Sequence, residues 1–439
     1  MILEHASIYH AHVGAALMVA RRSRGSRVTR WLPRIGGAPI VIGFFLGLLW
    51  VVASRTTEVS FWSRILIWQD ATFQDFETKF PARPIPNGPT AFSFRPAPAE
   101  VPSYLTTVTY RVGGRPLTWP TETLLPLDLA KVGGHPVTIG LDEFLASTGT
   151  TAFLVVKGND LLYEGYFNGA QRSSMQTSFS VAKSVVSALV GTAIADGLIT
   201  SVDDPITAYL PELAGRGLER VTIRHLLTMA SGLRYEGEGG GGGPFSDDAR
   251  TYYDPDLRAL ALNVRLDAEP GTRWQYNNYH PLLLGMILER VTGRSVSEYL
   301  SDKLWQPLGM EAPASWSLDS RHDGFEKMES GLNARAIDFA KFGRLYLDGG
   351  MWQGRQLIPR AWVDESTRVD STADPADFYQ YFWWVDSSAP DAHRFMARGN
   401  LGQFIYVMPD KDLVMLRFGT RFGYEAWPQV MRDLAARIP

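Results

Sequence analysis

The sequence predicts a mixed α/β fold of the α+β kind, in which an antiparallel sheet is built from both ends of the folded region. Residues 151–157 and 161–167 have the apolar and β-branched composition of strands, and the turn Gly158-Asn159-Asp160 separates them. Between the two ends, residues 203–345 have mainly helical periodicity. Helices therefore flank the predicted sheet, and a mainly helical region is inserted into it.

The remaining elements follow from the same patterns. A strand-rich segment extends from 103 to about 150, and it includes the turns Gly113-Gly114 and Gly133-Gly134. The clearest helices of the middle region are predicted at 222–229, 279–292, 296–304 and 335–347. Near the C-terminus, strands are predicted at 378–385, 403–408 and 413–419, followed by a helix at about 424–437.

The composition of the chain excludes several classes of function. With 439 residues, 45% of them hydrophobic and 20% charged, the chain can bury a large core. It has no cysteine, which excludes disulfides, thiol nucleophiles and cysteine metal sites. Its eight histidines have no metal-ligand spacing, so we expect no metal and no cofactor. The net charge of −3 includes six arginines within residues 1–34, so the body is acidic and nucleic acid is not an expected partner.

The N-terminal region predicts a membrane anchor. A basic head, residues 1–34, precedes residues 35–53, which contain no charged side chain. Cations before the apolar run predict that the body of the chain is exported to the periplasmic or extracellular side. A signal peptide cleaved after Ala53, which would give a secreted protein, is the alternative. A buried core helix is a third interpretation, and the flanking arginines argue against it.

Residues 54–102 are predicted to be a juxtamembrane segment and a proline-rich linker. Seven prolines between 81 and 102 favour a semi-rigid spacer. The folded domain is accordingly placed at 103–437, with the helical insertion at about 203–345.

Ser180 and Lys183 are the most informative residues of the chain. Their spacing places both side chains on one face of the first turn of a helix. That helix is apolar nearly all round and is predicted to end near Asp196, with Gly197 as its C-cap. A buried lysine with a lowered pKa can act as the base that activates a serine. The alternative is a surface lysine beside an N-capping serine.

Tyr276 and Asn278 form a second candidate element. A tyrosine on a turn next to a lysine can transfer protons to a leaving group, and an asparagine amide can orient a substrate carbonyl or the lysine. A packed tyrosine next to a capping asparagine is the alternative interpretation.

A third element is Arg398-Gly399-Asn400-Leu401-Gly402-Gln403. Glycines on an edge strand allow a backbone N–H to approach a substrate closely, and acyl transfer needs two such donors at the oxyanion. A β-bulge without a catalytic role is the alternative.

Residues 235–250 contain five consecutive glycines and are predicted to lack regular structure. Such a loop can close over a site, or it can be a surface insertion.

These elements, in this order, resemble the serine β-lactamase/penicillin-binding superfamily. The likeness is greatest to class C-type β-lactamases, related esterases and the 6-aminohexanoate-dimer (nylon-oligomer) hydrolase branch, and it covers about residues 140–437. The segments that carry the likeness are Phe179–Ser184, Val221–Gly232, Lys303–Met310, Gly331–Ala334 and Gly399-x-x-Gly402-Gln403.

The resemblance implies a role for each candidate residue. Ser180 is expected to be the nucleophile, Lys183 its base and Tyr276 the acid/base for the leaving group. Asn278 is expected to position the substrate and the lysine, and the N–H groups of Ser180 and the strand near Asn400 to form the oxyanion hole. Where the superfamily has Lys or His, then Thr or Ser, then Gly, this chain has Ala397-Arg398-Gly399, so Arg398 is the candidate for the positive charge.

The predicted function is therefore that of a serine hydrolase that cleaves a small amide or ester through an acyl-enzyme. The first alternative is a penicillin-binding-type peptidase or a β-lactamase, although the altered third motif argues against efficient β-lactam hydrolysis. A non-catalytic ligand-binding sensor of the same fold is a further alternative. The absence of Gly-x-Ser-x-Gly argues against an α/β-hydrolase.

Overall fold

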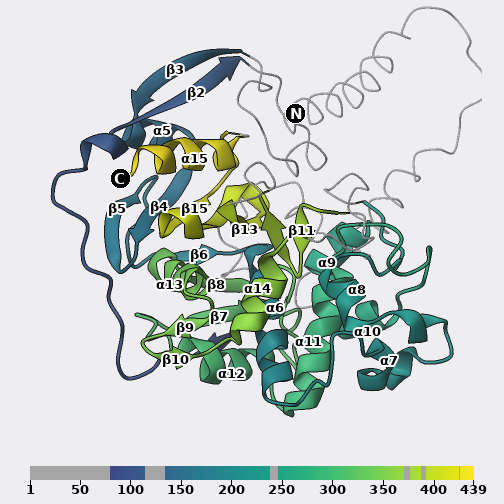
Figure 1. Cartoon of the computed structure of the whole chain (residues 1–439). Coiled ribbons are helices and arrows are strands. Elements are labelled where there is room, and N and C mark those ends of the chain that lie inside the picture. Colours follow the sequence, from purple (N-terminus) through teal and green to yellow (C-terminus); the bar gives the residue numbers. More distant parts are fainter. Residues whose placement is uncertain (1–79, 114–133, 238–245, 370–375, 387–391, 425) are drawn as a thin grey trace, which may run out of the picture. The chain divides into compact units, whose positions relative to one another are not determined.

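The computed structural model describes residues 80–113, 134–237, 246–369, 376–386, 392–424 and 426–439. A seven-stranded sheet forms its centre, and each pair of adjacent strands is antiparallel (Figure 1). Strands from both ends of the folded region build this sheet, as predicted. In sheet order, they are β11 (Tyr379–Gln380), β12 (Trp383–Val385), β13 (Phe395–Gly399), β14 (Gln403–Met408), β15 (Leu413–Gly419), β4 (Thr150–Lys157) and β5 (Asp160–Tyr166).

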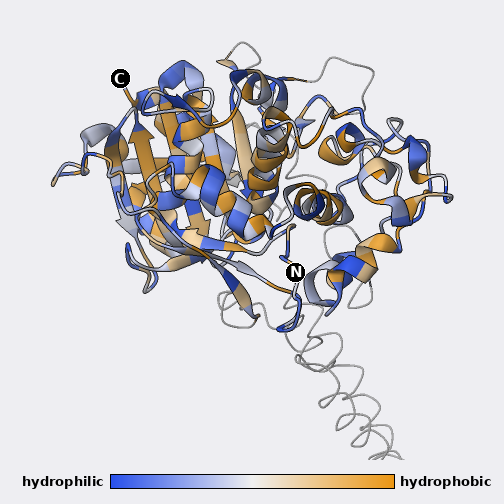
Figure 2. Cartoon of the chain, turned by 90° about the horizontal axis from the view of Figure 1, so that it is seen from below, coloured by the Kyte–Doolittle hydropathy of each residue, from blue (hydrophilic) through white to orange (hydrophobic). Residues whose placement is uncertain are grey.

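Helices cover both faces of the main sheet. On one face, α13 (Ala336–Leu347) packs closely, because Gly343 leaves room for Ile405 and Val414. The opposite face is covered by α5 (Leu141–Ser147) and α15 (Trp427–Arg437), whose Phe144 and Trp427 rings are in contact. Hydrophobic residues are concentrated on the strands between these layers (Figure 2). The β4–β5 hairpin and its turn are confirmed, whereas the helix α5, which was not predicted, lies within the segment that was predicted to be strand-rich.

The inserted region is mainly helical, as predicted, with a second sheet at its end. The four-stranded sheet has the order β1 (Ala82–Ile85), β7 (Ala314–Ser317), β8 (Leu332–Arg335) and β6 (Met175–Thr177). The strands β7 and β8 interrupt the predicted helical region of 203–345. The helices of the insertion are α7 (Ile206–Tyr209), α8 (Ile223–Leu227), α9 (Asp247–Tyr253), α10 (Leu257–Leu262), α11 (Tyr279–Thr292) and α12 (Val296–Leu300).

The smaller elements complete the fold. The strands β2 (Thr107–Gly113) and β3 (Gly134–Gly140) form one separate pair, and β9 (Met351–Trp352) and β10 (Arg355–Gln356) form another. The helix α14 (Arg360–Thr367) was not predicted. Short helical turns are η2 (Ser103–Leu105), η3 (Pro211–Leu213), η4 (Leu218–Arg220), η7 (Ser301–Trp305, a π-turn), η9 (Asn400–Gly402) and η10 (Pro409–Lys411).

The proline-rich segment is part of the folded domain and not the semi-rigid spacer outside it that its composition predicted. The strand β1 pairs with β7 along four residues, and the side chains of Phe80, Ile85 and Phe94 are buried. Pro84 is tolerated because β1 is the edge strand of its sheet. The described fold therefore includes residues before the predicted boundary at 103.

Two further predictions concern the N-terminal region and the glycine-rich loop. No helix in the described ranges is long and apolar enough to cross a membrane, and the predicted anchor at 35–53 lies outside those ranges. The basic head at 1–34 lies outside them as well. The prediction that 235–250 lacks regular structure is wrong at its end, because Ser246 caps α9 by accepting a hydrogen bond from Ala249 N. The glycines at 239–243 lie outside the described residues.

Candidate active site

The predicted helix around Ser180 and Lys183 is confirmed as α6 (Val181–Ala195), and Ser180 is its N-cap. Most of α6 is buried, because its apolar residues pack against α11 and β13. Ser184 Oγ donates a hydrogen bond of 2.7 Å to Phe382 O, which fixes the first turn of the helix. The reactive end of α6 is thus held rigidly against the main sheet.

Lys183 has the geometry of a general base. Its Nζ lies 2.9 Å from Ser180 Oγ and 2.9 Å from Glu329 O, and its side chain is only 1% exposed. Burial lowers the pKa of Lys183 to about 7, although the charges of Glu329 and Asp248 act in the opposite direction. The neutral amine is therefore accessible near neutral pH. The alternative of a surface lysine is excluded by this burial.

Tyr276 lies next to Lys183 and stacks on the ring of Trp384, which also contacts Arg398. Lys183 Nζ is 4.9 Å from the centre of its ring. The same ring stacks on Trp384 at 5.9 Å, and the Arg398 guanidinium lies over Trp384 at 5.1 Å. Burial lowers the pKa of Arg398 to about 10, with the Tyr276 charge opposing this shift.

The structure places Asn278 differently from the predicted contact with the lysine. Its Nδ2 donates to Asp248 Oδ1 at 3.1 Å and to Thr251 Oγ1 at 3.2 Å. Its Oδ1 is buried and has no hydrogen-bond partner among the described residues. Asp248 also accepts a hydrogen bond of 2.9 Å from Tyr235 Oη. Asn278 therefore orients a carboxylate whose charge acts on Lys183.

The third element meets the nucleophile segment where β13 ends. A Cβ atom added to Gly399 would lie 2.4 Å from Ser178 O, so only glycine permits this approach. Arg398 and Asn400, on either side of it, have separate surroundings. Arg398 forms no ion pair within the described ranges, and its guanidinium lies between the rings of Trp384 and Phe404. Asn400 begins η9, and its side chain accepts a hydrogen bond from Leu401 N at 2.9 Å.

Two buried side chains fix the turn that contains Asn400. Gln403 Nε2 donates to Asn400 O at 2.9 Å and to Gly419 O at 2.8 Å. Arg417 Nη1 donates to Leu401 O at 2.9 Å and to Gly402 O at 2.7 Å. Three consecutive carbonyl groups of the turn are thus bound by side chains. The backbone of this turn is thus fixed directly after Gly399, which approaches Ser178 O.

Several residues of the site were missed by the sequence reasoning. Glu329 and Lys327 lie in a connecting loop, are fully buried, and their charged groups are 3.9 Å apart. Asp248 follows the glycine-rich run, and Arg417 looked like an ordinary strand residue. The signal that could have found Lys327 and Glu329 was the high charge content of their loop, directly before the Gly331–Ala334 motif. In the described parts of the chain, no cluster of His, Asp and Glu is arranged to hold a metal ion.

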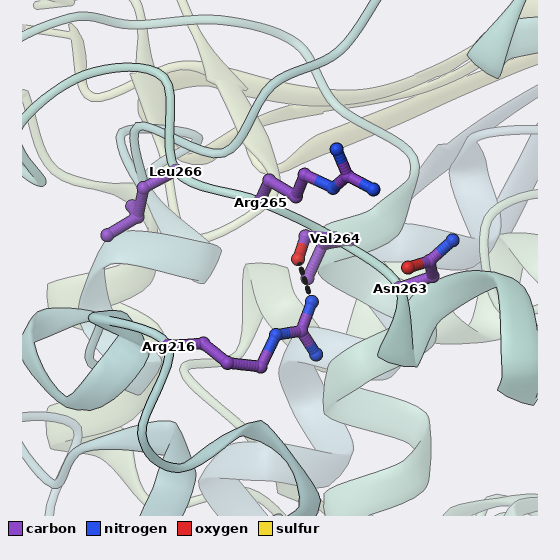
Figure 3. Close-up of a pocket in the computed structure, with 5 residues that line it drawn as sticks. All are labelled: Arg216, Asn263, Val264, Arg265 and Leu266. Atoms are coloured by element: carbon purple, nitrogen blue, oxygen red, sulfur yellow. Dashed lines mark hydrogen bonds between the residues drawn. The ribbon is translucent and has the colours of Figure 1, made fainter.

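A hollow of about 470 Å³ lies elsewhere in the inserted region (Figure 3). It is lined by Arg216 and by residues 263–266, and Arg216 donates to the backbone carbonyl of Val264. None of the predicted site residues lines this hollow.

Comparisons with known proteins show the family of the chain. The family model described as Beta-lactamase matches residues 141–437. A 6-aminohexanoate-dimer hydrolase from Paenarthrobacter ureafaciens is 28% identical over 319 residues, which cover 66% of this chain and 75% of that protein. Esterase EstB from Burkholderia gladioli is 38% identical over 143 residues, 30% of this chain and 36% of its own length.

A solved structure is similar over most of the chain. It is a Bacillus anthracis protein provisionally assigned as a 6-aminohexanoate-dimer hydrolase. Its TM-score is 0.68 at 23% identity, and the match covers 84% of this chain and 93% of that one. At this identity, the likeness supports the fold.

Proposed function

The chain belongs to the beta-lactamase family, as its motifs predicted, and from this premise we propose that it is a serine hydrolase that cleaves amide or ester bonds through an acyl-enzyme. The observation that carries the proposal is the 2.9 Å contact between Lys183 Nζ and Ser180 Oγ, made by a lysine with a pKa near 7. A serine hydroxyl needs such a base within hydrogen-bond reach.

Acylation follows from the positions of the side chains. Lys183 as the free amine accepts the Ser180 proton while Oγ attacks the substrate carbonyl carbon. The N–H groups of Ser180 and Asn400 bind the oxygen as it gains negative charge, with the positive end of α6 adding to their effect. Tyr276, close to Lys183, gives a proton to the leaving amine or alcohol when the carbon–nitrogen or carbon–oxygen bond breaks. Water then attacks the acyl-enzyme, with the same groups working in reverse.

The substrate class is proposed from the relatives and from one charge. The relatives include a 6-aminohexanoate-dimer hydrolase and an esterase, so small linear amides and esters are the first candidates. Arg398 has no ion-pair partner among the described residues, and it packs on Trp384, the ring on which Tyr276 stacks. This position favours a substrate that has a carboxylate near the scissile bond. Arg398 in place of the usual third motif argues against efficient β-lactam turnover. We propose that the enzyme acts on the exported side of a membrane.

The test is covalent labelling of the full-length chain by a fluorophosphonate, followed by intact-mass and peptide analysis. One adduct on Ser180 is expected, and none on Ser180→Ala. Lys183→Ala is expected to lower hydrolysis by several orders of magnitude, because the nucleophile and its base act as a unit. Hydrolysis by purified Ser180→Ala would disprove the assignment, and rapid turnover of a labelled penicillin would favour a β-lactamase instead.

A further inference from the structure

We propose that the segment Phe80–Ile85, which lies outside the family match at 141–437, is part of the active-site machinery. It supports the residues that flank both oxyanion donors, and it holds the loop that binds the Lys183 ammonium. This inference rests on the proposed function, since it assigns a positioning role in that reaction. It has two lines of support, one through Phe80 and one through Arg83.

Phe80 supports the oxyanion hole from within a separate apolar cluster. The cluster consists of the buried side chains of Phe80, Phe179, Tyr252 and Tyr253, with Leu401 packed against it. The Phe80 and Tyr253 rings stack at 6.3 Å with an angle of 24°. Phe179 immediately precedes Ser180, and Leu401 immediately follows Asn400. Each proposed oxyanion donor is therefore next to a member of this cluster.

Phe80 also covers a buried cation in the loop Gly324–Gly331. Lys327 Nζ lies 4.7 Å from the centre of the Phe80 ring, and the Lys327 side chain has no exposed surface. The same ammonium donates to Tyr252 O. An aromatic face compensates part of the cost of burying a cation. Without it, we expect the loop around Lys327 to rearrange.

Arg83 binds the same loop at a second point. Its Nη1 donates to Glu326 Oε1 at 2.6 Å and its Nη2 to Gly324 O at 3.1 Å. Glu326 is fully buried, so loss of its cation would leave a buried charge uncompensated. Three residues further along, Glu329 O accepts the hydrogen bond of Lys183 Nζ at 2.9 Å. The position of this carbonyl thus depends on contacts made by the N-terminal segment.

The strand β1 makes this support rigid. It pairs with β7, β7 pairs with β8, and β8 pairs with β6, which leads directly into Ser178. Ser178 N also donates to Leu332 O of β8 at 2.9 Å. A misplacement of about 1 Å caused far from the chemistry can reduce catalysis about 100-fold. Small displacements of Phe80–Ile85 are therefore transmitted through the paired strands to Ser180 and Lys183.

The test compares Phe80→Ala with Phe92→Ala in the full-length chain. Phe92 belongs to the same N-terminal region, but it packs on Phe94 and Trp352 at 5.3 and 4.8 Å, outside the cluster. Both variants lose a packed aromatic ring, so both are expected to lower Tm. Only Phe80→Ala should lower the fluorophosphonate labelling rate of Ser180 and kcat, by about 10-fold, with little change in KM. Phe80→Leu, which keeps an apolar side chain, should recover part of kcat.

The outcomes separate this inference from the proposed function. Wild-type kcat in folded Phe80→Ala, or in Phe80→Leu where the alanine variant does not fold, would overturn the positioning role. Equal losses of kcat in Phe80→Ala and Phe92→Ala would also overturn it, because they would reflect stability alone. A wild-type chain that is not labelled at Ser180 would overturn the proposed function, and the inference with it.

Discussion

Replacing Lys183 with methionine is expected to stabilise the fold at neutral pH while abolishing activity. The lysine side chain is buried, and its pKa falls from 10.5 to about 7 in the folded protein. One pKa unit corresponds to about 1.4 kcal/mol, so burying the ammonium costs the folded state about 5 kcal/mol. Methionine has a similar shape and no charge, and it removes this cost.

The lost hydrogen bonds offset part of the gain. Lys183 Nζ donates to Ser180 Oγ and to Glu329 O. Each bond contributes about 1 kcal/mol, which leaves a net stabilisation of about 3 kcal/mol below pH 7.

The pH dependence gives the sharper test. Above pH 7 the unfolded wild-type chain binds the Lys183 proton and the folded chain does not. Wild-type stability therefore rises with pH, by about 1.4 kcal/mol per unit relative to Lys183→Met. The gain in free energy of unfolding of Lys183→Met over wild type should be full below pH 7 and disappear near pH 9.

Urea unfolding of wild type, Lys183→Met and Ser180→Ala between pH 6 and pH 9 measures this difference. Ser180→Ala keeps the ammonium, so its stability should have the wild-type slope. Parallel curves for wild type and Lys183→Met would refute the reasoning, because they would mean that Lys183 does not lose its proton on folding.

Three further predictions concern catalysis. The kcat/KM value of the wild type should rise with pH and level off above about 7. Glu329→Gln should move this inflection to lower pH, because the Glu329 charge raises the pKa of Lys183. The control is Glu298→Gln, at an exposed residue in the first turn of α12, and an unmoved inflection in Glu329→Gln would contradict the assignment. Gln403→Glu replaces the amide that binds the carbonyls of Asn400 and Gly419, and kcat should fall by about 10-fold or more. Its control is Gln356→Glu at an exposed position of β10, which breaks a similar pair of bonds to Gly349 O and Ile358 O and should cost stability alone. Equal kcat losses in steady-state assays would argue against a role of Gln403 in catalysis. Gly399→Ala places a Cβ 2.4 Å from Ser178 O and should lower kcat by about 10-fold or more. The control is Gly140→Ala, whose new Cβ has Glu143 Cβ as its nearest neighbour at 3.9 Å and which should retain wild-type kcat. Wild-type labelling kinetics in Gly399→Ala would contradict the close approach.

Local sequence patterns predicted the elements that are stabilised by neighbours along the chain. The helix α11 ends at Thr292, as predicted, because Gly293 takes up the left-handed conformation that ends it. The spacing of Ser180 and Lys183 predicted their contact, since side chains three residues apart lie on one helix face. In both cases, the residues that determine the geometry are close in sequence.

The elements that were missed depend on partners distant in sequence. The strand β1 is defined by its pairing with β7, more than two hundred residues away, and its prolines indicated a spacer instead. The contact of Lys183 with Glu329 O joins residues 146 positions apart and involves a backbone atom, which no side-chain motif reports. Arg417 binds the carbonyls around η9 only because β14 and β15 pair in one register.

The conformations of Phe179 and Leu401 have a consequence for engineering this protein. Both residues have positive φ, 45° and 59°, which is unfavourable for side chains other than glycine by about 1–3 kcal/mol each. A stabilisation campaign that introduces glycine at strained positions would select these two sites early. Each substitution would relax the backbone, but it would also remove a side chain that lies next to a proposed oxyanion donor. Variants chosen by heat resistance alone would therefore lose turnover, and a selection that requires hydrolysis should retain both bulky residues.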